Sequence, residues 1–292
     1  MPQSPKIHAY FDEPTHTVSY LVVDPSTRAA AVVDPVLDYD HSGGTVSATS
    51  ARRMLADVKE AGLTLQWVLE THAHADHLSA APFLRRETGA RVVIGEHIAE
   101  VQRIFRQTFN LGDISGTGAE FDKLVRDGET FELGGLKVSV MHTPGHTPAC
   151  VSYRIGDAVF VGDTLFMPDY GTARADFPGG DARTLYRSIH RLLSLPADTR
   201  LFLCHDYKAP GRDRYAWETT VAEQRAHNVH VHEGVSEDEF VAMREARDAT
   251  LSAPQLLLPS VQVNIRAGHL PAAEDNGVSY LKIPLTLREP VQ

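Results

Sequence analysis

Residues 71–77 read THAHADH, so three histidines and one aspartate lie on a short segment directly after the apolar run at 65–69. A buried imidazole costs free energy unless both ring nitrogens find partners, and a buried carboxylate costs more. A bound cation would offset the desolvation of His72, His74, Asp76 and His77, and imidazole is a common ligand of zinc, copper, iron and nickel. The segment therefore predicts a metal site, and a solvated histidine-rich turn is the alternative interpretation.

Three other segments place a histidine or an aspartate after a predicted strand. His146 lies in an HTPGH turn, Asp163 ends the run VGD, and His205 lies in CHDY. Each alone has an ordinary explanation, since a turn histidine is usually exposed and an aspartate often caps a turn. Loops at the strand ends along one sheet edge build the sites of many α/β proteins. We therefore expect the four segments to converge on one site.

Hydrophobic periodicity predicts a layered α/β domain. Apolar residues recur at helical spacing at Met54, Leu55 and Val58, whereas short β-branched runs bounded by turn residues indicate strands. No linker divides the chain, so we expect one domain over 1–292, with its core at about 5–210 and a helical or irregular C-terminal extension at about 211–292. We predict strands at 17–24, 29–34, 65–69, 91–94, 136–141, 150–155, 158–161 and 200–203, helices at 51–61, 82–87, 98–108, 182–193, 215–228 and 236–251, a loop at 38–50 and an irregular tail from 254.

Composition narrows the classes of partner and compartment. The 292 residues are 42% hydrophobic and 23% charged, as in ordinary globular proteins, and carry a net charge of −10 that argues against nucleic acid or an anionic membrane as partners. The chain has neither an initial signal-like run nor the roughly 20 apolar residues that a membrane helix needs. The two cysteines, Cys150 and Cys204, form no disulfide framework and are interpreted as small buried hydrophobes. We therefore predict a cytoplasmic protein.

A second histidine-rich run reads HNVHVH at 227–232. Its spacing resembles that of metal ligands, but it lies where a predicted helix ends, and no carboxylate after a strand accompanies it. We interpret His227, His230 and His232 as solvated histidines.

The ordered set of an HxHxDH segment, a Gly-His turn, a Gly-Asp pair after a strand and a late histidine resembles the metallo-β-lactamase superfamily. That resemblance implies an αββα sandwich with metal held by loops at one edge of two sheets. A finer resemblance is to the bacterial persulfide dioxygenases, also called sulfur dioxygenases. Its C-terminal NIRAG segment matters most, because the related glyoxalase II thiolesterases end in a different helical domain. The segments that carry this resemblance are THAHADH at 71–77, GHTPAC at 145–150, GDTLF at 162–166, GTARADFPG at 171–179, CHDY at 204–207 and NIRAG at 264–268.

The resemblance implies an oxidoreductase of sulfur metabolism, which oxidises glutathione persulfide with O₂ and water to sulfite and glutathione. It implies one Fe(II) per chain, held by a 2-His-1-carboxylate set that leaves open coordination positions. The remaining groups would orient ligands and water or, as in dizinc relatives, hold a second metal. The implied iron ligands are His72, His146 and Asp163, the groups around them are His74, Asp76, His77 and His205, and the catalytic set is His72, His146, Asp163 and His205.

Glutathione carries carboxylates, so its site requires cationic or hydrogen-bonding partners. Arg174 has an alternative interpretation as an internal ion pair with Asp176 or Asp169. Lys208 and Arg212, the two cations after CHDY, have an alternative interpretation as plain solvated charge. The candidate substrate contacts are Arg174, Tyr207, Lys208 and Arg212.

Three rival functions use the same residues. A dizinc thiolesterase of the glyoxalase II type (a hydroxyacylglutathione hydrolase) would activate a hydroxide with two zinc ions, and NIRAG argues against it. A dizinc lactonase or lactamase is a second rival. A non-catalytic protein that senses persulfide is the third, although open coordination positions have little structural use. The sequence leaves the choice between a monomer and a homodimer open.

Overall fold

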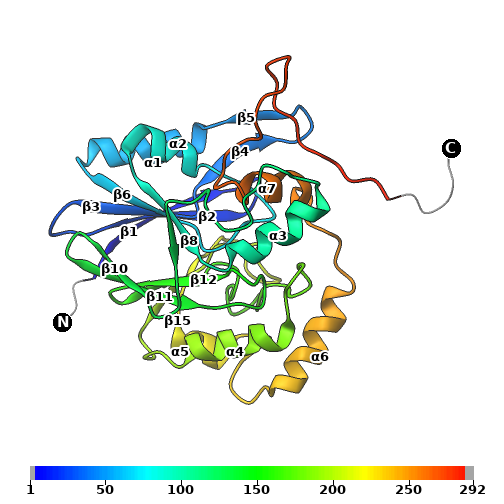
Figure 1. Ribbon diagram of the computed structural model, residues 1–292. Helices are drawn as coiled ribbons and strands as arrows, with labels where there is room; N and C mark the ends of the chain where they lie inside the picture. Colours follow the sequence, from blue (N-terminus) through cyan, green and yellow to red (C-terminus); the bar gives the residue numbers. More distant parts are fainter. Residues whose placement is uncertain (1–3, 287–292) are drawn as a thin grey trace.

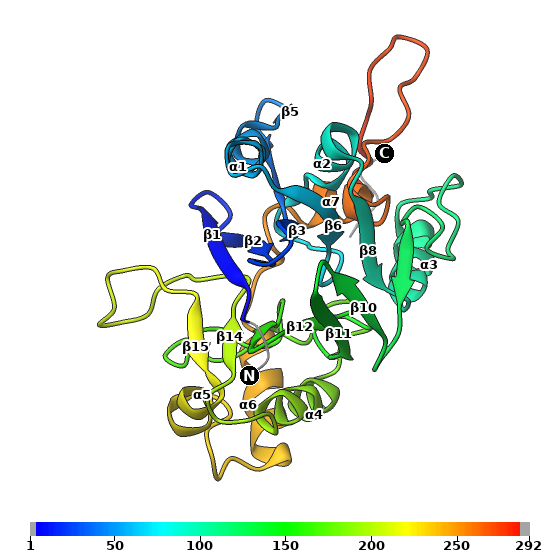
Figure 2. The ribbon, with the colours of Figure 1, turned by 90° about the vertical axis from the view of Figure 1, so that its left-hand side faces the viewer.

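Two six-stranded sheets stack face to face and helices cover both outer faces (Figure 1). The computed structural model describes residues 4–286. Turning the molecule shows the two sheets as separate layers, with α1 and α2 outside one and α4, α5 and α6 outside the other (Figure 2). The helices are α1 (Thr49–Glu60), α2 (Ala81–Thr88), α3 (Ile98–Thr108), α4 (Ala182–Leu193), α5 (Val221–His227), α6 (Glu237–Asp248) and α7 (Leu257–Asn264). The predicted αββα sandwich is confirmed.

The strands of the first large sheet come from the N-terminal part of the chain, and those of the second large sheet come from the part that follows. A third, three-stranded sheet with the order β5-β4-β7 lies beside them, and it consists of β4 (Val36–Asp40), β5 (Thr45–Ser47) and β7 (Leu78–Ser79). The first sheet has the order β1 (Lys6–Asp12), β2 (Thr17–Val23), β3 (Ala29–Val33), β6 (Thr64–Leu69), β8 (Arg91–Gly95) and β9 (Lys123–Val125). The second has the order β10 (Thr130–Leu133), β11 (Leu136–His142), β12 (Val151–Ile155), β13 (Ala158–Phe160), β14 (Arg200–Phe202) and β15 (Glu218–Thr220).

The layers pack through alternating side chains, as strand geometry requires. Tyr20 on β2 belongs to the cluster between the sheets, where it meets Phe160 and Phe202 at ring-centroid distances of 5.2 and 5.5 Å. Its neighbour Leu21 belongs to the cluster beneath α1 and α2. Burying a side chain of this size contributes about 1.5–3 kcal/mol. The central strands are therefore buried on both faces, and their ends are held rigidly at the edge where the site forms.

The structure corrects three local predictions. The segment 38–50 is not a loop but contains the end of β4, all of β5 and the start of α1, because 38–40 pairs with 45–47 as a hairpin and because Asp38 accepts hydrogen bonds from Ser50. The predicted helix 215–228 begins only at Val221, since 218–220 pairs with β14 as the strand β15. The tail from 254 is not wholly irregular, because α7 forms within it.

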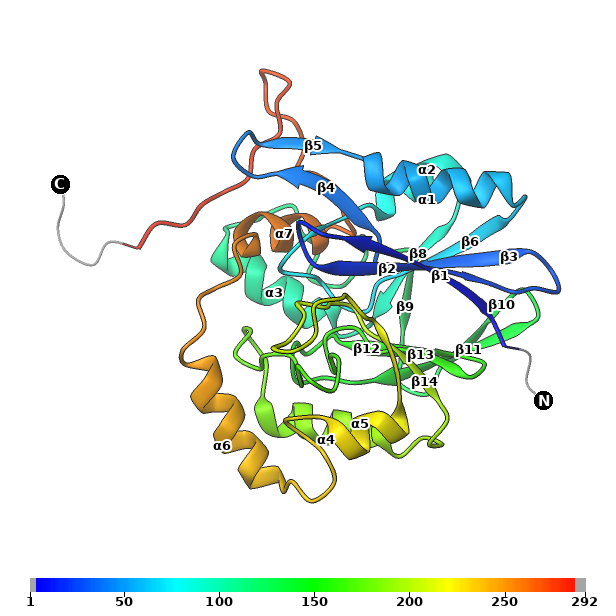
Figure 3. The same cartoon turned by 180° about the vertical axis from the view of Figure 1, so that it is seen from behind.

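The C-terminal extension returns to the body of the molecule. Ser236 and Glu239 form the predicted capping box at the start of α6. The chain then runs from α6 along the edge of the molecule to α7, which lies beside the first sheet (Figure 3). Among residues 4–286, no helix combines the length and apolar character needed to cross a bilayer.

Candidate metal centre

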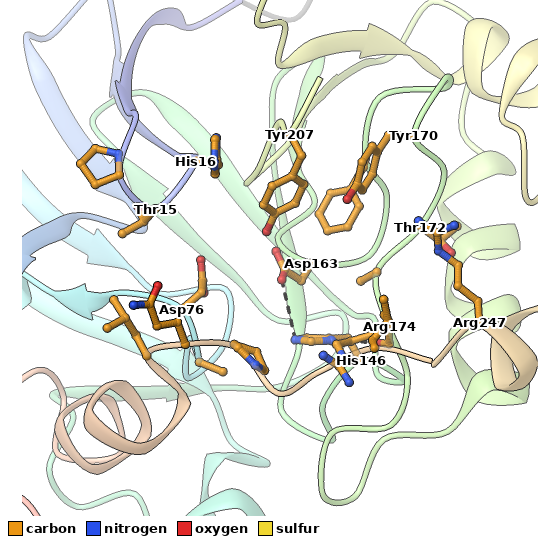
Figure 4. Close-up of a pocket in the computed structure, with 18 of the residues that line it drawn as sticks. Thr15, His16, Asp76, His146, Asp163, Tyr170, Thr172, Arg174, Tyr207 and Arg247 are labelled. Atoms are coloured by element: carbon orange, nitrogen blue, oxygen red, sulfur yellow. Dashed lines mark hydrogen bonds and ion pairs between the residues drawn. The ribbon is translucent and has the colours of Figure 1, made fainter. Parts of the chain in front are cut away.

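The loops after four strands meet at one edge of the two sheets. The THAHADH loop follows β6, the turn with His146 follows β11, Asp163 follows β13 and His205 follows β14. Ligand atoms of His72, His146 and Asp163 all lie within 4.8 Å of one another, and all three residues are buried. Figure 4 shows Asp163 and His146 facing each other at the bottom of a pocket. The structure thus brings together the residues that the sequence singled out.

The first group of donors fits a single metal ion. Oδ2 of Asp163 lies 3.9 Å from Nε2 of His72 and 3.7 Å from Nε2 of His146. An ion with bonds of about 2.1 Å spans two ligands up to about 4.2 Å apart. Nε2 of His72 is buried without a hydrogen-bond partner among the described residues. Buried polar atoms are rarely left unpaired, so a cation between this nitrogen and Oδ2 of Asp163 accounts for the arrangement.

Donors for a second ion lie next to the first group. Nε2 of His205 is 3.2 Å from Oδ1 of Asp163 and 3.2 Å from Oδ2 of Asp76. Nδ1 of His74 and Nε2 of His77 are also buried without a partner among residues 4–286. Asp163 therefore lies between two sets of donors, one through each carboxylate oxygen.

Polar contacts on the far side of the His146 and His74 rings fix the orientations of these two rings. Nδ1 of His146 lies 2.8 Å from the carbonyl oxygen of Arg174, and Nε2 of His74 lies 3.0 Å from Oδ1 of Asp34. Asp34 also accepts hydrogen bonds from the amide and the hydroxyl of Thr71. Such outer partners set the tautomer and the direction of a metal-binding imidazole. Nε2 of His146 is thereby directed at Asp163, and Nδ1 of His74 remains available.

Opposite charges balance within the buried site. Burial alone would raise the pKa of Asp163, but the imidazoles of His205, His72 and His146 hold it well below its usual range. Burial and the charge of Asp34 raise the pKa of Glu70, which lies behind the site, to about 7. The carboxylates nearest the open donor atoms are therefore ionised at neutral pH, as metal binding requires.

A cavity of about 550 Å³ opens above the donors. Asp76, His146 and Asp163 form its base, and segment 251–256 of the C-terminal extension contributes to its wall. Figure 4 shows Tyr170 and Tyr207 on one side of this cavity and Arg247 on another. The cavity thus combines a charged base with aromatic and cationic walls, which suits a small anionic ligand.

The four predicted substrate contacts differ in their surroundings. Tyr207 and Arg174 line the cavity, but the Arg174 guanidinium already forms two bonds to Asp176, at 2.5 and 2.7 Å, and one to the carbonyl of Ser252. This favours the internal ion pair for Arg174.

Lys208 and Arg212 are not among the residues that line the cavity. The ammonium of Lys208 lies 4.3 Å from the ring centre of Tyr215, and Arg212 pairs with Asp169 and Asp206. A substrate role for either residue stays a prediction, and their surroundings favour structural interactions.

Two residues of α6 that line the cavity were not among the predicted site residues. Arg244 is buried and pairs with Asp248 at 2.6 Å. Arg247 lines the cavity and makes no side-chain hydrogen bond or ion pair with any residue of 4–286. Periodicity predicts the helix but cannot reveal that the extension folds back over the metal loops, so no sequence signal marked these arginines.

His230 is not a plain solvated histidine. Its Nδ1 accepts a hydrogen bond from the amide of Thr172 at 3.1 Å, and Thr172 lines the cavity. Burial, reinforced by the charges of Arg244 and Arg247, lowers the pKa of His230 to about 4. The neutral ring is therefore part of the structure that supports the cavity wall.

Acid should weaken the native state through His230. The His230 imidazole takes up a proton near pH 6.5 in the unfolded chain but only near pH 4 in the native chain. The stability of the native state therefore falls as the pH drops through that window and is unaffected above it. Between pH 7 and pH 4 the unmodified chain should lose about 2–3 kcal/mol of unfolding free energy relative to His230→Gln, which cannot titrate. Urea unfolding at each pH measures this difference, and parallel curves for the two proteins would contradict it.

Comparison with known proteins agrees with this geometry. Residues 12–205 match the model of the metallo-β-lactamase superfamily. The chain is 54% identical over 290 residues to a "probable metallo-hydrolase" of Burkholderia pseudomallei, covering 96% of this chain and 98% of the other. It is 30% identical over 262 residues to the human mitochondrial persulfide dioxygenase ETHE1, covering 88% and 87% of the two chains.

A solved structure matches over nearly the whole chain. The crystal structure of ETHE1 from Myxococcus xanthus superposes with a TM-score of 0.72 at 35% identity, covering 90% of this chain and all of that one. The match includes most of the C-terminal extension, which the superfamily match over 12–205 does not reach. The chain belongs to the metallo-β-lactamase superfamily and, within it, is a homologue of the ETHE1 persulfide dioxygenases.

Proposed function

We propose that this protein is a persulfide dioxygenase that oxidises glutathione persulfide with O₂ and water to sulfite and glutathione. The observation that carries the proposal is the set of His72, His146 and Asp163, of which His146 and Asp163 line the base of a cavity whose wall holds Arg247, an arginine unpaired among residues 4–286. Two histidines and one carboxylate are typical of non-heme ferrous sites that keep open positions. Homology to the human enzyme and to the Myxococcus protein supports the same activity.

The reaction balances without a further reactant. The terminal sulfur of the persulfide is oxidised, dioxygen is reduced, and water supplies the third oxygen of sulfite while the thiol is released. When bound, ferrous iron supplies the redox chemistry that activates dioxygen. The protein holds the carrier, orients the terminal sulfur and limits the access of bulk water, which is the work of the cavity walls.

The surroundings of Asp163 favour one metal per chain. Nε2 of His205 lies 3.2 Å from a carboxylate oxygen of Asp163 and also from one of Asp76. Through these two contacts, His205 bridges the two carboxylates and fixes the direction of Asp163. This arrangement occupies donors that a second metal would need, so we assign His205 to orienting Asp163. We place the reaction in the cytoplasm, because both cysteines are free and buried.

Arg247 is our candidate for the group that binds a carboxylate of glutathione. Arg247→Ala should raise the KM for glutathione persulfide about tenfold while kcat changes less than about twofold, because one charge-assisted hydrogen bond distant from the reacting sulfur is lost. Steady-state oxygen uptake measures both constants. Lys208→Ala removes a cation outside the cavity and should leave KM unchanged. A rise in KM for the Lys208 variant alone would reverse this assignment.

A dizinc thiolesterase is the second candidate. It is favoured by the neighbouring group of donors from His74, Asp76 and His77 and by the hydrolase name of the Burkholderia relative. Iron-loaded and zinc-loaded protein should each be assayed for oxygen uptake on glutathione persulfide and for cleavage of S-lactoylglutathione. We expect oxygen uptake with iron alone and negligible thiolester cleavage with either metal. Efficient thiolester cleavage by the zinc form, without oxygen uptake by the iron form, would support the hydrolase instead.

A further inference from the structure

The C-terminal helix α7 ends against the loop that carries the metal-binding residues. Helix α7 packs on β7, the two-residue strand that follows THAHADH in the chain. Its last residue, Asn264, is 4% exposed and lies in the interior. This contact joins residues about 190 positions apart in sequence.

The Asn264 amide is fully engaged with the metal-binding loop. Nδ2 donates to the carbonyl oxygens of His74 and His77, at 2.8 and 2.7 Å, and Oδ1 accepts from the amide of Ser79 at 2.9 Å. A carboxamide has two N–H donors and one acceptor oxygen, and all three are used here. Aspartate would retain the acceptor but lose both donors, and alanine would lose all three.

The residues after Asn264 hold it in place. Gln102 of α3 donates to the carbonyl oxygen of Ile265 at 2.9 Å, and Ile265 is buried in the core beneath the first sheet. Gly268 has a φ of +84°, and a Cβ there would lie 2.6 Å from Cδ of Pro82 and 2.8 Å from the carbonyl oxygen of Ser79. The segment 264–268 is thus tightly packed beside the metal-binding loop. It cannot shift without disturbing the core.

We propose that Asn264 is a positioning residue of the metal centre. By binding the carbonyls of His74 and His77 and the amide of Ser79 directly after the loop, it fixes the loop backbone and hence the directions of the His74 and His77 rings. The residue contacts neither metal nor substrate, and it acts through the loop. This inference rests on the metal site of the proposed function but not on the identity of the reaction, so metal binding tests it independently of persulfide turnover.

Asn264→Ala and Asn264→Asp should both weaken ferrous iron binding about 10- to 100-fold, the usual effect of removing a partner that orients ligands. Anaerobic competition against a chelator of known affinity measures this. Asn228→Ala is the matched control, because Asn228 is equally buried and also bonds to backbone, at Gly171, His230 and Val231, but contacts no residue of the metal-binding loop. It should lower the melting temperature while leaving iron affinity within about twofold. Folded Asn264 variants with unchanged affinity would overturn the proposal.

Hydrogen exchange on the unmodified chain supplies a test that needs no variant. Coupling between two sites is reciprocal, so iron that holds the loop must also hold what the loop contacts. Iron loading should slow exchange at the Ser79 amide and across 261–268, and it should leave α6 unchanged as the internal control. Slowing at Ser79 without any change across 261–268 would show that the C-terminal segment is not coupled to the site. If iron binds with these effects but no oxygen uptake follows, the positioning role stands and the proposed reaction fails.

Discussion

Replacing Asp163 with alanine is expected to strip the iron and abolish turnover. Asp163 is the only carboxylate in the group with His72 and His146, and its two oxygens lie between the two sets of donors. Its removal leaves two neutral imidazoles to hold a dication in a buried site. We expect iron content below about a tenth of that of the unmodified chain and oxygen uptake reduced at least about 1,000-fold. Elemental analysis and an oxygen electrode measure the two effects.

Asp76→Ala is the matched control for this prediction. Asp76 is also a carboxylate of the site but belongs with His205 rather than with His72 and His146. With one iron per chain, the Asp76 variant should retain the metal, whereas a dinuclear site would lose one of two ions. Retained iron with near-normal turnover in the Asp163 variant would refute the assignment of the ligand.

Gly145→Ala should be the most damaging single-methyl change near the site. Gly145 has a φ of +131°, and a Cβ there would lie 2.3 Å from the backbone nitrogen and Cα of Leu185 on α4. Neither backbone atom can move without displacing the helix. Overpacking of this kind costs about 1–3 kcal/mol or more, in addition to about 1–2 kcal/mol for the left-handed backbone. Because His146 is the next residue, iron content should fall together with stability.

Gly211→Ala separates the cost of the left-handed backbone from the cost of the contact with α4. Gly211 has a φ of +89°, but apart from its two chain neighbours no residue of 4–286 has a heavy atom within 4 Å of the position that a Cβ would occupy. This variant should lose only the backbone contribution of about 1–2 kcal/mol and should keep its iron. Chemical unfolding of the apo proteins measures the stabilities. Equal losses for the two variants would show that contact with α4 is unimportant.

The part of the site that follows from sequence is the part built from strand ends. Four motifs, each after an apolar run, predict one edge, because strands of a layered α/β fold deliver their following loops to the same place. The local pattern of apolar runs followed by motifs is enough to place His72, His146, Asp163 and His205 at this edge. The order of the strands within each sheet is not needed.

What the sequence could not predict depends on contacts between distant segments. The hairpin of β4 and β5 has the polar, glycine-rich composition of a loop, and the first residues of β4, Val36 and Leu37, pair with β7, which lies beyond β6 in the chain. Helix α7 contains Pro259 and is buried along most of its C-terminal half, so it lacks the one-sided apolar stripe of a surface helix. Arg247 and Asn264 enter the site only because this extension folds back.

The same contrast separates the predicted basic residues from Arg247. Lys208 and Arg212 are close to His205 in sequence, which made them candidates for binding substrate. In the structure, Arg212 forms ion pairs with two aspartates instead. Arg247, which lies much farther along the chain, reaches the cavity with its charge unpaired among residues 4–286. Proximity in sequence to His205 therefore does not bring these two basic residues to the cavity wall, whereas the strand-end motifs do bring the predicted metal-binding residues together.

The most direct test of the proposed function is the stoichiometry of oxygen uptake and sulfite formation by the iron-loaded chain on glutathione persulfide. An oxygen electrode gives the uptake and ion chromatography gives the sulfite, with iron-free protein as the background. We expect one O₂ to be consumed for each sulfite formed, with uptake that depends on iron. No uptake above the background from protein with iron fully bound would contradict it.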